Sequence, residues 1–445
     1  TNVKSTSDLV DGLLTGRLYG PNGTTTDDDG LSYVEQRYLG FFTYKPTLLD
    51  GRAKLKAAFE IDFTFGDASN TSRGNAGAAI NGDTVNLQTK RLAADIELIK
   101  GLNLVVGLQP LADSAHDPTT VFPDTLMHGG THLTFWGTDA AGVSLFGKLH
   151  RRLVGRVSWF DLYLNQSDKD DDVQLLMADA EVGVSDATQV GLHLWYLRDR
   201  SRGVGSALGA GPGSPLGDYN GAAPLRLSPD LAQGDLFYVG LDASYNRWLA
   251  GGPLTVSGFA VANFGSFEVV PGPCRAEGAR VPCPTPAFDD TPADLLGFLV
   301  DLEAAWRWGR TNGDLLSLEL LYATGDDSPQ DRTLSSVVTG NNYGIPGALH
   351  GTHRSLLLFP DIRSVNRQVA VVYDPANLGH GVMAAFLNGS VDLVADQLNL
   401  KLGLATAQAA AVEAGTDRFI GVEGNAELLY RPMPFLWFGA HAAVV

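Results

Sequence analysis

The stretch from Lys54 to Phe65 alternates strictly between apolar and polar or small side chains. Successive side chains of a β-strand point to opposite faces, so this pattern predicts a strand with one apolar and one charged face. Its twelve residues exceed the usual length of a globular strand, about 5–6 residues. They are enough to cross a bilayer at a tilt, which takes roughly 9–11 residues.

Such a strand fits two kinds of protein. In a soluble sandwich the apolar face is buried and the charged face is solvated. In an outer-membrane barrel the apolar face contacts lipid and the polar face lines an aqueous lumen. The rest of the chain decides between them, through the number of such strands and the lengths of their connections.

The alternating pattern recurs along the whole chain. The phase slips once, near Lys90 and Arg91, which predicts a β-bulge there. The candidate at 131–149 is long enough to hold two strands. The seventeen predicted strands are 9–19, 31–45, 53–65, 84–99, 102–110, 131–149, 153–165, 172–184, 187–198, 235–249, 254–268, 293–308, 314–325, 381–394, 398–408, 417–430 and 435–445.

Short and long connections alternate between these strands. Residues 100–101, 185–186 and 395–397 form short ones, whereas 66–83 and 269–292 are long. This alternation is typical of an up-and-down barrel with tight periplasmic turns and long outer loops. Two further long connections, 199–234 and 326–380, are candidates to fold into the lumen, because long loops without periodicity are usually functional or disordered.

We therefore predict one all-β domain over residues 1–445, a transmembrane antiparallel up-and-down β-barrel. Seventeen strands would leave the last one open at the outer end, whereas bacterial single-chain barrels have an even number. We expect about 18 strands: either a final loop and strand are absent from this sequence, or the count of seventeen is wrong by one. Aromatic residues beside the turns fit the girdles of membrane interfaces: Tyr38, Phe41, Phe42, Tyr44, Trp306, Trp308, Tyr430, Phe435, Trp437 and Phe438.

Composition agrees with a barrel in the bacterial outer membrane. No run approaches the roughly 18–20 apolar residues of a membrane helix. Charged residues make up 18% of the chain, below the roughly 25% of a soluble domain. The net charge of −18 argues against nucleic acid as a partner, because nucleic acid binds basic surfaces.

Two features outside the strands bear on metals and covalent links. Acidic runs, including Asp27, Asp28, Asp29, Asp170 and Asp171, are either solvated loop tips or sites for a divalent cation such as Ca²⁺. They lack the spacing of an EF-hand. Cys274 and Cys283, the only cysteines, are predicted to form a local disulfide in an oxidising compartment, with two free thiols as the alternative. We expect no other cofactor.

The sequence contains no metalloprotease, nucleophile-elbow or phosphate-loop motif, so we do not expect an enzyme. The alternation instead assigns charged residues to the pore lining, where rings of charge set ion or solute preference. Among them Arg37, Lys54, Lys56 and Arg91 would form a basic arc. The predicted pore-lining residues are Glu35, Arg37, Lys54, Lys56, Glu60, Asp62, Arg91, Arg156, Asp301, Glu303, Arg307, Lys401 and Glu423.

Three short stretches resemble the alginate-export family of outer-membrane proteins. They are Tyr33-Val-Glu-Gln-Arg-Tyr38, Gly101-Leu-Asn-Leu-Val-Val-Gly-Leu-Gln-Pro110 and Leu321-Tyr-Ala-Thr-Gly-Asp-Asp327. The resemblance implies a monomeric barrel of eighteen strands that passes a polysaccharide or another solute. Members of this group also serve as general porins.

We therefore expect an outer-membrane channel for passive transport or export of a polysaccharide or a small hydrophilic solute. Its partners would be membrane lipids, lipopolysaccharide and the solute. The alternative is a scaffold barrel that surrounds a periplasmic or surface partner in a larger complex. That partner would sit at the open strand edge, since an unpaired edge invites strand addition, or it would fill the lumen.

Overall fold

The structure is a computed structural model that describes most of the strand regions of the chain. All structural statements refer to these described residues: 34–65, 86–111, 115, 138–163, 172–200, 232–246, 252–269, 274–276, 279–281, 293–311, 313–328, 333–338, 355–359, 372, 375–412, 414–415 and 417–445. Within these ranges, no helix is long and apolar enough to cross a membrane.

One large sheet dominates the fold, and its strands follow one another in chain order. The first ten are β1 (Val34–Tyr44), β2 (Ala53–Phe65), β3 (Asn86–Ile99), β4 (Leu102–Leu111), β5 (Thr138–His150), β6 (Leu153–Tyr163), β7 (Val173–Gly183), β8 (Thr188–Asp199), β9 (Ala232–Tyr245) and β10 (Leu254–Val269). The others are β13 (Ala293–Arg307), β14 (Leu315–Ala323), β15 (Thr333–Leu334), β16 (Val382–Val394), β17 (Leu398–Gln408), β18 (Phe419–Met433) and β19 (Leu436–Val444).

The predicted fold class is confirmed. Each long strand pairs antiparallel with the next, and sixteen of the predicted strands correspond to sixteen of these strands. The remaining candidate, 9–19, lies outside the described residues. The two-residue β15 adds a short parallel pairing with β13, and β11 (Cys274–Ala276) and β12 (Ala279–Val281) form a separate small hairpin.

The predicted bulge near Lys90 and the long candidate strand at 131–149 both lie in or next to described strands. The register between β2 and β3 passes from Ala58↔Arg91 to Phe59↔Thr89, which leaves Lys90 as the extra residue of a bulge. The predicted phase slip is thus confirmed. The long candidate at 131–149 contains a single strand, β5, and its first residues lie outside the described part of the chain.

Burial along the strands is inverted relative to a soluble protein, as β14 illustrates. Leu316, Leu318, Leu320 and Tyr322 are each more than 40% exposed on the outer face. Ser317, Glu319, Leu321 and Ala323 alternate with them and are at most 3% exposed. Exposed large apolar side chains that alternate with buried polar ones are typical of a sheet whose outer face contacts lipid.

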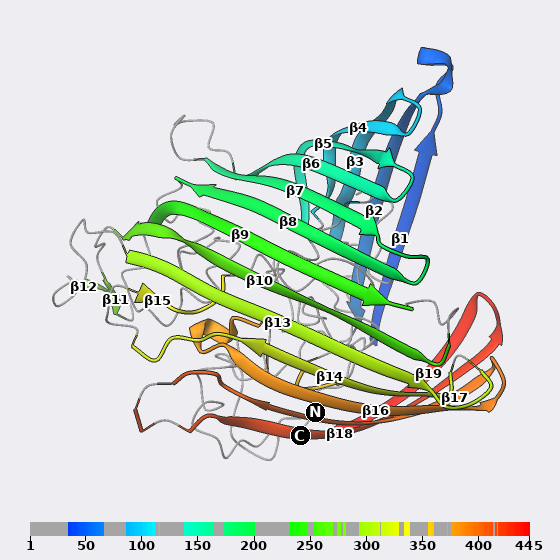
Figure 1. The fold of residues 1–445 in the computed structure, drawn as a ribbon, viewed down its shortest axis with the longest axis vertical. Helices are drawn as coiled ribbons and strands as arrows, with labels where there is room; N and C mark the ends of the chain where they lie inside the picture. The colour runs from blue at the N-terminus through cyan, green and yellow to red at the C-terminus, as the bar shows by residue number, and fades with distance from the viewer. Residues whose placement is uncertain are drawn as a thin grey trace.

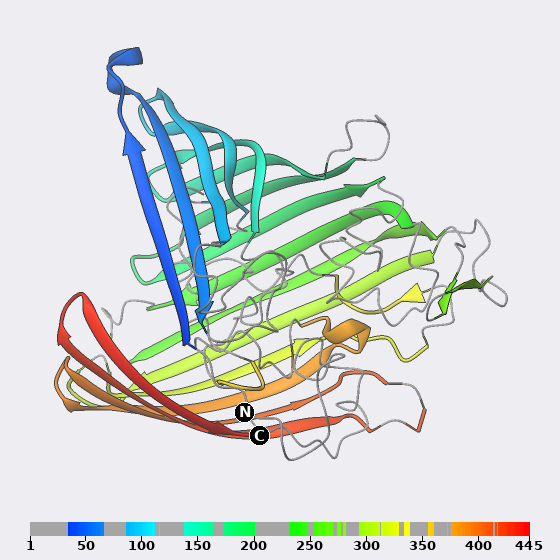
Figure 2. The same cartoon turned by 180° about the vertical axis from the view of Figure 1, so that it is seen from behind.

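The strands curl around a common interior, with β1 and β19 as the two ends of the sheet (Figures 1 and 2). Short turns such as Lys100–Gly101 and Arg151–Arg152 lie at one end of the strands, and the strand ends that the long connections join lie at the other. Exposed aromatic residues gather at the turn end, among them Tyr44, Trp308 and Trp437. This is the predicted aromatic girdle of a membrane interface.

The inner face has two zones. Toward the long connections it is apolar, as with Val173, Leu175 and Met177 of β7. Buried polar side chains lie near the turns on β6 to β9, near mid-strand on β13 to β16 and nearer the long connections on β18. We call them together the polar belt: Arg156, Asp179, His193, Asp242, Asp301, Glu319, Asn388, Glu423 and Asn425. The sequence predicted a polar lining throughout. The apolar zone arises because parts of the connection between β14 and β16 pack against the wall there.

The turn between β13 and β14 is organised by Asp314. Its Oδ1 accepts the N–H of Asp392 at 3.0 Å, and its Oδ2 accepts those of Thr311 at 3.2 Å and Arg310 at 2.9 Å. These backbone N–H groups, that of Asp392 first, lower the pKa of the Asp314 carboxyl from its ordinary value of 3.8. Hydrogen bonds to a carboxylate favour its charged form.

The outward orientation of β14 predicts a depth-dependent penalty for charge. Leu318→Arg places a cation near the middle of the apolar band and should cost about 2–4 kcal/mol of folding free energy in a bilayer. Urea titration of the barrel refolded into vesicles measures this cost. The matched control, Gln397→Arg in an exposed turn, should leave the unfolding midpoint unchanged. Equal effects of both changes would contradict the outward placement of Leu318.

Asp314 predicts an acid-dependent contribution to stability. Because its pKa is lower in the folded chain, the carboxylate stabilises the fold fully above its ordinary pKa, and this contribution is lost as the pH falls through the lowered value. Asp314→Asn should therefore lower the unfolding midpoint at pH 7, and the gap to the unchanged protein should narrow in strong acid. A pH-independent gap between the two proteins would refute this origin.

Candidate functional site in the barrel interior

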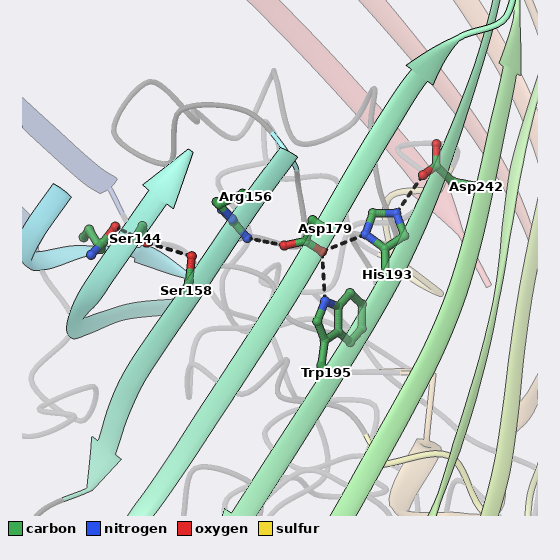
Figure 3. Close-up of polar contacts among 8 residues, drawn as sticks. Ser144, Arg156, Ser158, Asp179, His193, Trp195 and Asp242 are labelled. Atoms are coloured by element: carbon green, nitrogen blue, oxygen red, sulfur yellow. Dashed lines mark hydrogen bonds and ion pairs between the residues drawn. The ribbon is translucent and has the colours of Figure 1, made fainter. Parts of the chain in front are cut away.

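The largest ionic network of the polar belt spans β6 to β9 and is shown in Figure 3. Arg156 Nη2 donates to Asp179 Oδ2 at 3.0 Å, and Trp195 Nε1 donates to Asp179 Oδ1 at 2.9 Å. His193 Nδ1 lies 2.8 Å from Asp179 Oδ1, and His193 Nε2 lies 2.7 Å from Asp242 Oδ2. The side chains of Arg156 and Asp179 are fully buried.

His193 lies between two carboxylates, an arrangement that favours the charged imidazolium. Both ring nitrogens can donate only when the imidazole is doubly protonated. The network then balances two cations, Arg156 and His193, against the carboxylates of Asp179 and Asp242. Gly191 makes room for it, since a Cβ at 191 would lie 1.7 Å from Asp242 Oδ2. Buried charges are tolerated when paired in this way.

An uncharged ladder continues the belt toward β4. Ser158 donates to Ser144 at 2.8 Å, and Ser144 donates to Gln109 Oε1 at 2.8 Å. Gln109 in turn donates to the carbonyl of Gly142 at 3.1 Å. The three side chains are at most 1% exposed. They join neighbouring strands across the inner face without adding charge.

The expected basic arc on β2 and β3 is partly neutralised. Lys56 Nζ lies 2.9 Å from Asp95 Oδ2, and Lys54 Nζ lies 3.9 Å from the same oxygen. Arg91 is buried, with its guanidinium carbon 5.9 Å from the ring centroid of Phe41. The arc is therefore a mixed-charge surface rather than a purely basic one.

Carboxylates are concentrated on the wall from β13 to β18. Glu303 and Glu319 are direct cross-strand partners, and Asp301 lies on the same inner face. Lys401 of β17 forms an ion pair with Glu427, whose other oxygen lies 3.1 Å from His441 Nδ1. The acidic side chains of this wall therefore lie next to one another on the inner face.

Parts of the connection between β14 and β16 lie against the inner face. Tyr238 donates its hydroxyl to the carbonyl of Val338 at 3.0 Å, so residue 338 sits inside the sheet. Residues 355–359 contact β16 and β18, and Val372 donates its N–H to the Leu358 carbonyl at 3.0 Å. Described parts of the connection 326–380, one of the two predicted to fold inward, thus lie in the interior. The other, 199–234, is almost entirely outside the described residues.

The described pore-lining candidates lie on the inner face. Their parts in transport remain predictions: Lys54, Lys56, Arg91, Arg156, Asp301, Glu303, Arg307, Lys401 and Glu423. Glu35, Arg37, Glu60 and Asp62 belong to β1 and β2, but their side chains are not described. Asp27, Asp28, Asp29, Asp170, Asp171 and Cys283 lie outside the described residues, and only the backbone of Cys274 is described. Among the residues that are described, no group of three or more His, Cys, Asp or Glu is placed to hold a metal ion.

The sequence pattern alone does not single out Asp179, Asp242 or Trp195. The structure places His193 between the first two of these residues. Asp179 alternates in step with the inward residues Leu175 and Met177. This alternation is the feature of the sequence that places Asp179 on the inner face. Asp179 lies directly opposite His193 in the β7–β8 hairpin, whereas Asp242 belongs to β9, beyond a long connection. Alternation alone does not show which inward residues meet.

No protein-family model matches the sequence, and neither does any curated protein. Similar solved structures include OpdK of Pseudomonas aeruginosa with vanillate, at 14% identity and a TM-score of 0.47, covering 92% of this chain and 87% of that one. Another is OccAB1 of Acinetobacter baumannii, at 11% identity and a TM-score of 0.46, covering 92% and 85%. An anion-selective porin from Comamonas acidovorans has 12% identity and a TM-score of 0.42, covering 87% and 82%.

The fold is established by strand pairing and inverted burial rather than by these distant likenesses. Those two features define a transmembrane antiparallel β-barrel. The similar structures include an anion-selective porin and an outer-membrane protein. The resemblance to the alginate-export family stays a prediction, since no family model matches the chain.

The network around Asp179 predicts a large stability effect. Asp179→Ala leaves the buried cations Arg156 and His193 without their shared carboxylate and should cost about 3–5 kcal/mol. Denaturant unfolding of the refolded barrel measures the loss. The control is Asp186→Ala, which removes a solvent-exposed pair with Arg152 and should leave the unfolding midpoint unchanged. Similar small effects at both positions would show that the buried network contributes little.

Proposed function

We propose that the chain is an outer-membrane channel through which small hydrophilic solutes pass passively. The observation that carries this proposal is the inverted wall, apolar outside and charged inside. A charged inner face is useful where water and polar solutes occupy the interior. The ionic network of β6–β9 and the carboxylates of β13–β18 supply that face.

The inward connection favours small solutes over a polymer. Residues 336–338 and 355–359 lie against the inner wall on the side of β9 to β18 and occupy part of the space that an extended polysaccharide would need. A polysaccharide, the cargo implied by the alginate-export resemblance, is therefore our second choice after a small solute. Vanillate and glucuronate, bound in similar structures, illustrate the size of solute we have in mind.

The charge of the wall favours cations. Asp301, Glu303 and Glu427 line the β13–β18 side, and Asp95 counters the lysines of the opposite arc. Rings of carboxylates give cation preference. We further propose a monomeric barrel in contact with lipid and lipopolysaccharide that carries out no covalent chemistry. Calcium in the acidic loops remains a prediction.

The scaffold reading rests on a different observation. Among the described strands, β1 and β19 do not pair with each other, so the sheet has two edges. Unpaired edges invite another strand, which a partner protein could provide. This alternative predicts a barrel without ion conduction.

Conductance in a planar bilayer tests the proposal. The purified protein should form open channels with a reversal potential on the cation side in a KCl gradient. Glu303→Gln should move the reversal potential toward zero, because Glu303 is a partly exposed carboxylate of the acidic wall. Gln397→Glu in an exposed turn is the control and should change nothing. The absence of any conductance would favour the scaffold reading, and anion preference would overturn the role of the acidic wall.

A further inference from the structure

We propose that Glu423 is the residue that positions the inward segment Ser355–Phe359, and thereby holds the channel interior at a fixed width. This inference rests on the proposed channel function. The segment belongs to the connection between β14 and β16, and Glu423 projects from β18 on the inner face.

The contact is a carboxylate held by consecutive backbone N–H groups. Leu356 donates its N–H to Glu423 Oε1 at 2.7 Å. Leu357 and Leu358 donate theirs to Oε2 at 2.9 and 2.7 Å. Asn425 Nδ2 adds a fourth donor to Oε1 at 2.8 Å. Successive backbone N–H groups that converge in this way form an anion-binding concavity.

Burial makes this contact consequential. Glu423 is 0% exposed, so its charge is stabilised by these four donors in place of water. Removal of one partner of a buried charged contact leaves the other unsatisfied. In the segment, the three N–H groups of Leu356, Leu357 and Leu358 would then point at a vacant space on the wall.

Apolar packing on either side of the carboxylate also holds the segment against the wall. Phe359 packs edge-to-face on Phe386 of β16, with ring centroids 5.2 Å apart. Leu358 Cδ2 lies 3.3 Å from the position a Cβ would take at Gly421. Ser355 closes the turn, because its hydroxyl accepts the N–H of Phe359 at 2.7 Å.

The neighbouring wall carboxylate Glu427 has different partners. It forms an ion pair with Lys401 and lies 3.1 Å from His441 Nδ1, and these residues all belong to β17, β18 and β19. Glu427 is therefore a matched control on the same strand. Substitution of Glu427 removes a carboxylate from the wall and leaves the contacts of the segment Ser355–Phe359 in place.

The consequence is a steric role for Glu423 rather than an electrostatic one in transport. Without the carboxylate the segment loses its hydrogen bonds to the wall and keeps only the apolar packing of Phe359 and Leu358. We therefore expect the segment to detach from the wall intermittently. Each departure changes the free cross-section on the β16–β18 side. The channel current should then pass to sublevels more often than in the unchanged protein.

The experiment compares single-channel recordings of the unchanged protein, Glu423→Ala and Glu427→Ala. Glu423→Ala should increase the frequency of current sublevels on the order of tenfold, equivalent to about 1.4 kcal/mol. Added formate, a carboxylate small enough to occupy the vacated space, should suppress these sublevels in Glu423→Ala. Glu427→Ala should shift ion selectivity without adding sublevels, and formate should not alter its current pattern.

Heat-modifiable mobility on SDS gels shows that each variant has folded before it is recorded. A second variant, Glu423→Gln, keeps the shape of the side chain and should give an intermediate sublevel frequency. Steady current in folded Glu423→Ala would overturn the positioning role while leaving the channel function intact. Sublevels that formate does not suppress would also overturn it. Absence of current in the unchanged protein would instead sink the channel proposal.

Discussion

The whole structure depends on the absence of water from the membrane interior. Every backbone N–H and C=O group that faces lipid must find a partner within the protein. Antiparallel pairing from β1 through β19 provides those partners over the described strands. Since successive side chains alternate, the same pairing directs one set of residues to lipid and the other inward. The outer leucines of β14 and its inner Glu319 are two results of this one constraint.

The inner face then has to accommodate charge in a confined space. Around Asp179 this is achieved by balance, because two cations meet two carboxylates. Around Glu423 it is achieved by backbone N–H groups that belong to another part of the chain. From β13 to β18 carboxylates outnumber their cationic neighbours, and this is the part of the wall that we propose contacts the solute. In the proposed channel, stability and transport therefore involve different parts of one polar belt.

Several features could be predicted because they depend only on local periodicity. The strand positions, the bulge at Lys90, the alternation of turn and loop lengths and the inward phase of residues such as Lys56 and Arg156 are of this kind. Partnerships were not predictable in the same way. The alternation places Lys54 and Lys56 on the inner face, where they would form a basic arc. Asp95 of the neighbouring strand also points to the inner face and neutralises part of their charge.

By itself, the sequence determined that this chain forms a membrane-spanning antiparallel barrel. The two-residue period of a strand produces a matching alternation of apolar and polar residues along the chain. Only the tertiary structure decided what the interior contains. Contacts between His193 and Asp242, or between Glu423 and Leu356, join residues 49 and 67 positions apart. Such contacts depend on the curvature of the sheet and on the path of a long connection, and no local pattern encodes either.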